Sequence, residues 1–236
     1  DIYYRVHAQN FGWLDWAKNG DSAGTEGYAY RLEAIEIRMI PKGENAPGST
    51  ENPFYKKQEA VTSGYLIMGT SNVTDKELVS YFNRYKGSTV YDTYLGTNSK
   101  YNGVLSKGGA ATIEDFCKIF YEECLAEGVK PEVAFAQSML ETGFLRYGGD
   151  VLPNQYNFAG LGATGNGVHG NSFKDVRTGI RAQVQHLKCY ASMDPLNQPL
   201  VDQRWSESLR GKAPTVEKLQ GTWATSTTYA KTLLQA

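Results

Sequence analysis

The hydrophobic and polar positions of the first forty residues alternate with a period of two. The alternation runs from residue 28 to 34 and continues one residue out of phase from 35 to 39. This period is that of a β-strand, and the change of phase predicts a β-bulge. The segment from Pro41 to Pro53 is rich in Pro, Gly, Asn, Ser and Glu and lacks periodic apolar positions. We therefore expect a small β module over residues 1–42 and a linker over residues 43–60.

Beyond the linker the apolar spacing becomes helical. Residues 112–127 begin with a threonine followed three positions later by an acid, which favours a capping box, and they stop before Gly128. Pro131 favours the first position of a second helix that ends before Gly143, and a third helix is expected over 175–191. A short fourth helix is expected from Thr227. The fold class predicted is α+β, with a mainly α-helical domain over residues 61–236.

A glycine-rich segment, residues 157–170, separates the second and third predicted helices. Its glycines are too frequent for a helix, so we expect an exposed loop or hairpin that a ligand can approach. Three cysteines are present, and Cys117 and Cys124 lie seven apart on one predicted helix, too far for a disulfide. We expect free thiols. His186 and Cys189 are spaced for a shared metal but lack further clustered ligands, so we expect no metal site.

Composition narrows the class of function. The 236 residues carry 24 Lys+Arg against 25 Asp+Glu, which leaves a net charge of −1 and no general positive field for nucleic acid or anionic lipid. No apolar run approaches the length of a membrane span. Sixteen tyrosines and 25 glycines suit grooves in which aromatic rings stack on flat polar ligands, such as sugars.

Glu141 is the first candidate for chemistry. It lies in the last turn of an otherwise apolar predicted helix, four residues after Gln137 and on the same face. The negative end of the helix dipole and the nearby Phe144 would raise its pKa, which is what a general acid requires. The alternative is a surface glutamate that reaches solvent.

Three segments resemble the glucosaminidase domain of family 73 glycoside hydrolases, which occurs in autolysins that cut peptidoglycan. They are residues 132–165, which carry the Glu-Thr-Gly and the glycine-rich loop, the stretch SFKDVRTGIRAQVQHL, and the C-terminal WATSTTYAKTL. The resemblance extends over residues 61–236. It implies a lysozyme-like α-helical fold with Glu141 as general acid and Tyr229 as an assisting phenol.

The resemblance also suggests where the sugar binds. We expect the substrate groove to be lined by Gln137, Gln155, Asn157, Phe158 and Asp175. Glycoside hydrolysis usually needs a second carboxylate, for which Asp150 and Asp175 are candidates. Asp175 also fits a helix N-cap and Asp150 a turn. Alternatively, the acetamide of an N-acetylglucosamine substrate supplies the nucleophile itself, oriented by Tyr229. His169 is not expected to be catalytic.

The N-terminal residues from Val6 to Met39 resemble the clostridial hydrophobic repeat with a tryptophan. The shared positions include His7, Gly12, Trp13, Trp16 and Gly27. The resemblance implies a surface protein whose repeat binds a wall polymer or a partner protein. The two tryptophans serve either as a sugar platform or as the core of a module of about forty residues.

Together these observations predict a secreted, wall-associated endo-β-N-acetylglucosaminidase that cleaves β-1,4 bonds in the glycan strands of peptidoglycan. No metal or organic cofactor is expected. Two alternatives stay open: a muramidase or lytic transglycosylase on the same fold, and a non-catalytic protein for wall binding or adhesion.

Overall fold

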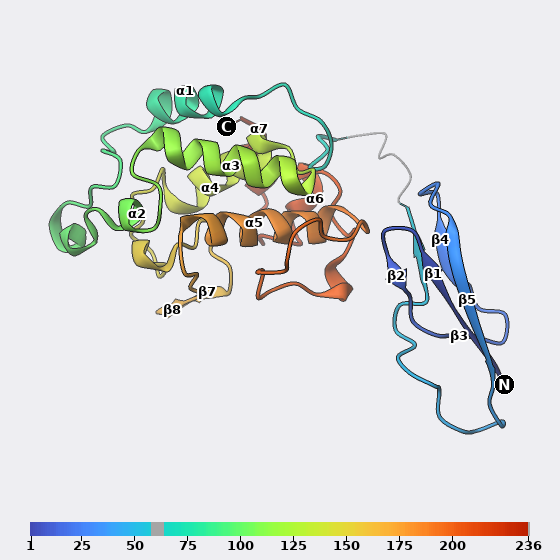
Figure 1. Ribbon diagram of the computed structural model, residues 1–236. Helices are drawn as coiled ribbons and strands as arrows, with labels where there is room; N and C mark the ends of the chain where they lie inside the picture. Colours follow the sequence, from blue (N-terminus) through green and yellow to red (C-terminus); the bar gives the residue numbers. More distant parts are fainter. Residues whose placement is uncertain (58–63, 236) are drawn as a thin grey trace. The chain divides into compact units, whose positions relative to one another are not determined.

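The computed structural model describes residues 1–57 and 64–235 (Figure 1). The described residues divide into two compact units, the first formed by residues 1–57 with 193–195 and the second by residues 64–192 with 196–235. The first consists of strands and the second is mainly helical, so the predicted α+β class is confirmed.

The first unit is built on a long antiparallel pair. Strand β1 (Ile2–Ala8) pairs along its length with β5 (Leu32–Met39). The other edge of β1 pairs with two short strands, β2 (Gly12–Trp13) and β3 (Ala17–Lys18). A separate parallel pair joins β4 (Gly24–Glu26) to β6 (Phe54–Lys56). Strand β6 thus belongs to the first unit, although its residues lie within the range predicted as linker.

The predicted bulge is present, but the strand that carries it is shorter than expected. The register shifts where His7 and Ala8 face Ala34 and Leu32, so that Glu33 is the extra residue. The strand does not extend back to Tyr28, because Ala29 adopts a left-handed conformation with φ 56°. Tyr28 instead enters the small core of this unit, which also contains Val6, Leu14 and Tyr55.

The two tryptophans of the first unit have different environments. Trp16 is buried, whereas Trp13 exposes 45% of its surface. The guanidinium of Arg5 lies 4.8 Å from the ring centre of each, and Arg38 lies over Trp16 as well. Trp16 therefore fits the core alternative, and Trp13 is the tryptophan left accessible to a ligand.

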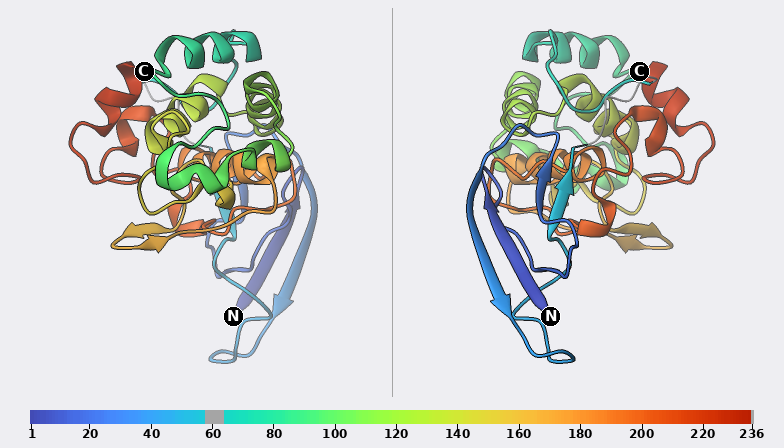
Figure 2. Two further views of the ribbon diagram at one scale, coloured as in Figure 1. Left: turned by 90° about the vertical axis from the view of Figure 1, so that its left-hand side faces the viewer. Right: turned by 90° about the vertical axis from the view of Figure 1, so that its right-hand side faces the viewer.

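The second unit contains all the helices α1 to α7 of the described residues (Figures 1 and 2). They are α1 (Asp75–Tyr85), α2 (Val104–Lys107), α3 (Ile113–Glu127), α4 (Pro131–Thr142), α5 (Val176–Ala191), α6 (Val216–Leu219) and α7 (Tyr229–Gln235), with 3₁₀ turns at Gly96–Tyr101, Pro153–Gln155 and Glu207–Leu209. Strands β7 (Ala163–Gly165) and β8 (Val168–His169) form an antiparallel hairpin within the glycine-rich segment. The hairpin alternative for this segment is thus confirmed.

Local sequence signals set the ends of the three main helices. Thr112 and Asp115 form the predicted capping box of α3, and Gly128 ends that helix at φ 74°. Pro131 occupies the first turn of α4, and the side chain of Asp175 caps α5 by accepting from the Thr178 amide at 2.7 Å.

Helix α4 makes contacts with four other helices of the second unit, α1, α3, α5 and α7. Its buried residues include Val133, Phe135 and Met139, which join a large core containing Phe116, Phe120 and Phe158. All three cysteines are buried free thiols, as expected. Because α4 is held on several sides, a side chain in its last turn has a fixed position.

Candidate active site

Glu141 lies in the last turn of α4, the central helix of the second unit. The helix ends at Gly143, whose φ of 58° lies in the left-handed region that glycine adopts without steric cost. The Thr142 hydroxyl donates to the Ser138 carbonyl at 2.7 Å and accepts from the Leu145 amide at 3.0 Å. The residue that follows the glutamate is thus held to the helix end.

The turn that follows has an unusual backbone. Phe144, Leu145 and Tyr147 all have φ between 56° and 61°, a region that non-glycine residues seldom adopt. Each such residue costs about 1–3 kcal/mol, and such conformations cluster at functional sites. The turn places Phe144 against Tyr81, with ring centres 5.8 Å apart. Phe144 thus faces a different hollow from the one next to Glu141, contrary to the sequence expectation.

Glu141 and Tyr229 lie together, although 88 residues separate them in the chain. The Tyr229 hydroxyl donates to Oε1 of Glu141 at 2.8 Å. Burial raises the pKa of Glu141, and hydrogen bonds from Tyr229 and Trp223 only partly oppose that rise. The residue as a whole is nevertheless exposed to solvent. It is therefore an accessible acid whose proton is held to higher pH than that of an ordinary glutamate.

Two buried glutamines extend the hydrogen bond between Glu141 and Tyr229 into a chain of hydrogen bonds that leads into the interior of the protein. Gln137 Nε2 donates to the Tyr229 hydroxyl at 3.0 Å, and Gln183 Nε2 donates to Gln137 Oε1 at 3.0 Å. Neither glutamine exposes any surface. Gln137 thus lies on the face of Glu141, as predicted, but it contacts Tyr229 and is closed off from a substrate.

A cavity of about 380 Å³ opens next to Glu141, within the size range of small-molecule sites. Its walls come from the end of α4 and the turn after it, from the glycine-rich segment, and from the loop before α7. Residues that line it include Glu141, Tyr147, Asp150, Ala159, Gly160 and Trp223. The glycine-rich segment thus approaches the acid, as expected for a ligand-binding loop.

Trp223 forms one wall of this cavity and is held from behind. Its ring centre lies 5.0 Å from that of His186, and Nδ1 of His186 is 2.8 Å from the buried carboxylate of Asp202. An indole fixed in this way can stack on the face of a sugar ring.

The side chains of Gln155, Asn157 and Phe158 are turned into the glycine-rich loop and the core. Gln155 Nε2 donates to the His169 carbonyl at 3.0 Å, and Asn157 Nδ2 donates to the Leu161 carbonyl at 2.9 Å. Phe158 has no exposed surface and packs on Phe116. None of the three lines the cavity next to Glu141, and their contact with a sugar stays a prediction. These amides satisfy backbone carbonyls of the glycine-rich segment and so shape the wall whose surface is formed by Ala159 and Gly160.

The two candidate second carboxylates occupy different places. Asp175 caps α5 and does not line the cavity next to Glu141, so the N-cap alternative describes it. Asp150 does line that cavity, and its Oδ1 accepts from the Gly167 amide at 2.9 Å. Nδ1 of His169 contacts the Asp150 carbonyl oxygen, which ties the hairpin to the same turn.

Sequence reasoning missed Trp223, Tyr147 and Gln183. Trp223 lies only six residues before Tyr229, so a tryptophan so near the predicted phenol was a usable signal. Tyr147 follows Glu141 closely, but its position depends on the left-handed turn. Gln183 falls between apolar positions of α5, and its burial gives no signal in the sequence.

Comparison with known proteins adds an independent observation. Residues 117–236 match the family model for glucosaminidase, described as mannosyl-glycoprotein endo-beta-N-acetylglucosaminidase. The chain belongs to the glucosaminidase family. It is therefore a glycoside hydrolase, and its substrate is a glycan. Residues 7–41 match the clostridial hydrophobic W model, so both predicted resemblances are confirmed, in the predicted order.

This glucosaminidase also has a curated relative. An uncharacterized protein of Borreliella burgdorferi is 38% identical over 167 residues, which is 71% of this chain and 80% of the relative. No solved structure matches the chain. Among the residues that the structure describes, no helix is both long and apolar enough to cross a bilayer.

Proposed function

We propose that this glucosaminidase cleaves the β-1,4 bond after N-acetylglucosamine in peptidoglycan glycan strands, with Glu141 as general acid. The observation that carries the proposal is the carboxyl group of Glu141, which borders the cavity and receives a hydrogen bond from Tyr229. Its raised pKa keeps the carboxyl group protonated to higher pH than an ordinary glutamate, as a general acid requires.

The first step transfers the Glu141 proton to the glycosidic oxygen while the bond from that oxygen to the anomeric carbon breaks. The acetamide oxygen of the same N-acetylglucosamine bonds to the anomeric carbon and forms an oxazolinium ion. In the second step water attacks that carbon, the oxazolinium ring opens, and the water proton returns to the Glu141 carboxylate. The residues of the chain thus donate, hold and recover one proton.

Asp150 is suited to assist from the cavity wall. It is the other carboxylate that lines this cavity, and one of its oxygens is held by the Gly167 amide. A negative charge here would stabilise the positive oxazolinium ion and orient the acetamide. Trp223 supplies an apolar surface for the ring of the sugar.

We further propose that the enzyme is secreted and that its first unit holds it at the cell wall. The support is the clostridial hydrophobic W match and the exposed face of Trp13 above Arg5. A Trp13→Ala variant should then sediment less with purified sacculi than the parent, while its turnover of soluble glycan stays the same.

The decisive experiment identifies the new chain end. Peptidoglycan is digested, reduced with borohydride and analysed by mass spectrometry. The proposal predicts reduced N-acetylglucosamine at the new ends. Reduced N-acetylmuramic acid would identify a muramidase, and an anhydro-muramic end a lytic transglycosylase. Binding to sacculi without any new end would favour a wall-binding protein.

A further inference from the structure

We propose that Gln183 and Gln137 are positioning residues that determine which oxygen of Glu141 carries the transferable proton. Together with Tyr229 and Glu141 they form the amide relay, a chain of hydrogen bonds from α5 through α4 to the acid. The inference rests on the proposed function, because it takes Glu141 as the general acid.

The direction of the amide relay is set by one backbone carbonyl. Gln183 has a side-chain atom 2.9 Å from the carbonyl oxygen of Ala134. A carbonyl oxygen only accepts, so that atom is the amide nitrogen. The same nitrogen lies 3.0 Å from a side-chain atom of Gln137, which must then be Oε1. Reversing the Gln183 amide would place two acceptors against each other, and reversing the Gln137 amide alone would place two donors against each other.

The orientation of the two amides also determines the orientation of the Tyr229 hydroxyl. With its oxygen facing Gln183, Gln137 presents its nitrogen to the Tyr229 hydroxyl at 3.0 Å, and the hydroxyl oxygen accepts. The single hydroxyl proton is then directed to Glu141 Oε1, 2.8 Å away. Burial raises the pKa of Tyr229 well above its ordinary value, so the phenol keeps this proton.

The consequence appears at the two oxygens of Glu141. In a neutral carboxyl group the carbonyl oxygen is the better acceptor, so the hydrogen bond from Tyr229 to Oε1 favours the proton on Oε2. The carboxyl group also accepts a hydrogen bond from Trp223, which is independent of the two glutamines. Oε2 faces the glycine-rich wall, because a Cβ built on Gly160 would lie 4.0 Å from it. Gly160 lines the cavity together with Asp150 and Tyr147, the other titratable groups there. The relay thus points the acid proton toward the space where the glycosidic oxygen would lie.

Without Gln137 the phenol loses this constraint. Its hydroxyl oxygen can then accept a hydrogen bond from a protonated Oε1 as readily as its hydroxyl group donates one to that oxygen. In a fraction of the molecules the Glu141 proton would then lie on Oε1, away from the cavity, and these molecules would not be productive. The two amides prevent this with dipoles alone and bring no net charge near the acid.

The test is a double-mutant cycle with Gln137→Met and Tyr229→Phe, measured on soluble glycan strands from peptidoglycan. Gln137→Met should lower kcat about tenfold, and Tyr229→Phe about tenfold to a hundredfold. Because Gln137 acts only through Tyr229, the double variant should match Tyr229→Phe within a factor of about 2. Losses that multiply in the double variant would overturn the proposal.

The pH profile separates positioning from simple structural damage. Loss of the Tyr229 donor removes an interaction that lowers the pKa of Glu141. The alkaline limb of kcat/KM should therefore move to higher pH in both single variants. The matched control is Gln185→Met, another fully buried α5 glutamine, which binds the Pro199 carbonyl instead. It should lower the unfolding midpoint and leave the limb in place. A limb that stays in place in Gln137→Met would contradict the relay.

Two further outcomes are distinguishable. If Gln137→Met does not fold, Gln183→Met carries the same cycle, since it removes the donor to Gln137 Oε1. If Glu141→Gln keeps its turnover, the proposed function itself fails. If Glu141→Gln is inactive but the losses multiply, only the relay is wrong.

Discussion

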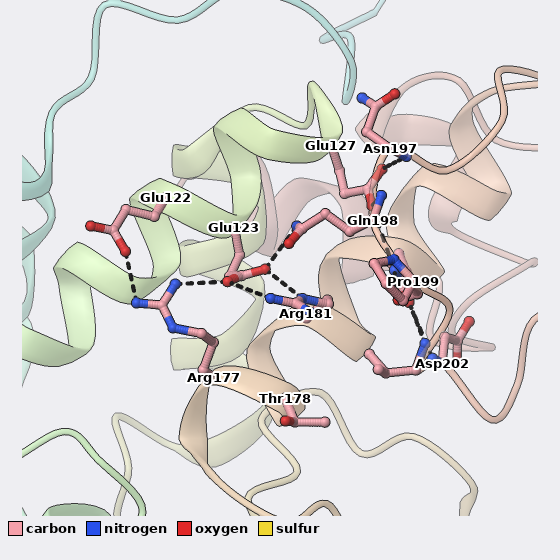
Figure 3. A network of polar contacts seen from close by, with 12 residues as sticks. Glu122, Glu123, Glu127, Arg177, Thr178, Arg181, Asn197, Gln198, Pro199 and Asp202 are labelled. Carbon is pink, nitrogen blue, oxygen red and sulfur yellow. Dashed lines mark hydrogen bonds and ion pairs between the residues drawn. The ribbon is translucent and has the colours of Figure 1, made fainter. Parts of the chain in front are cut away.

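Helix α5 takes part in two buried polar networks that differ in charge. Toward α4 it contributes Gln183 to the amide relay, which contains no cation. Toward α3 it contributes Arg177, Arg181 and Lys188 to a network of ion pairs, much of which is drawn in Figure 3. The first network reaches the candidate acid, and the second fixes helices and a loop.

The charged network is built around two glutamates of α3. Glu123 binds Arg177 and Arg181 at 2.8 Å each, and Glu127 binds Lys188 at 2.8 Å. Glu127 also accepts from the backbone amides of residues 197 and 198, at 3.0 and 3.1 Å (Figure 3). The chain from 197 to 202 is thus tied to α3 and α5, which lie side by side (Figure 1).

The difference shows how a fold can fix the orientation of an acidic side chain without stabilising its negatively charged form. No cation contributes to the raised pKa of Glu141, which burial determines. A lysine or arginine at the same distance would favour the carboxylate and remove the proton that catalysis needs. Amide dipoles orient the group instead. Ion pairs are suited to the other side of α5, because there strong attachment matters and no proton is transferred.

The largest effect is expected from breaking the buried ion pair. Lys188→Met would leave Glu127 charged and 0% exposed, and the free energy of unfolding should fall by about 3–5 kcal/mol. Urea denaturation measures the loss. The exposed Lys118→Met is the control and should change stability by less than about 0.5 kcal/mol. A loss near that of the control would mean that the charged network does not hold the fold.

The next effect concerns the charge in the cavity. Asp150→Asn keeps an oxygen to accept from the Gly167 amide but removes the negative charge, and turnover should fall about a hundredfold. Asp175→Asn is the matched change outside the cavity, and asparagine caps a helix as well as aspartate does. Equal turnover in the two variants would contradict a role for Asp150 in catalysis.

The two networks should also respond to pH with opposite sign. Burial alone would raise the pKa of Glu123, but hydrogen bonds from Arg181, Arg177 and Gln198 outweigh it, and the pKa lies below 4.5. Its contribution to stability is therefore present above pH 4.5 and is lost as the pH falls through its folded pKa. The stability gap between the parent and Glu123→Gln should narrow in that acidic range.

Glu141 should show the reverse. Its folded pKa is raised above 4.5, so the folded state keeps a proton that the unfolded state releases. The parent should lose stability relative to Glu141→Gln as the pH rises from 4.5 through the folded pKa. Urea titrations of the parent and both variants at a series of pH values measure the two slopes. Slopes of equal sign would remove the distinction between the networks.

The smallest effect is expected at the rim of the charged network. Glu122 pairs with Arg177 at 2.7 Å, but 41% of its side chain is exposed. Glu122→Gln should lower the free energy of unfolding by less than about 1 kcal/mol. A loss as large as that of Lys188→Met would show that the surface pair is part of the buried core of the network.

Much of the fold could be predicted because the helix ends are encoded locally. Thr112, Asp115, Gly128, Pro131 and Gly143 act on the backbone within one turn of themselves. Helix α1 carries the same kind of signal, a capping box formed by Thr74 and Glu77, and its bounds were nevertheless not predicted.

The candidate site was only partly predictable, because its contacts span distant parts of the chain. The resemblance correctly placed Tyr229 beside Glu141. The roles of the other polar residues depend on which way each side chain turns. Gln155 and Asn157 satisfy backbone carbonyls inside the loop, and Gln183 meets Gln137 across 46 residues of sequence. Periodicity places such residues on a face of an element but does not identify their partners.

The most direct test of Glu141 as the acid is the turnover of Glu141→Gln on soluble glycan strands at the pH optimum of the parent. The amide keeps an acceptor for the Tyr229 hydroxyl but has no proton to transfer, so folding should be retained. The account predicts a loss in kcat of about 10²- to 10⁴-fold. A folded Glu141→Gln variant that still turns over at a rate close to the parent's would contradict it.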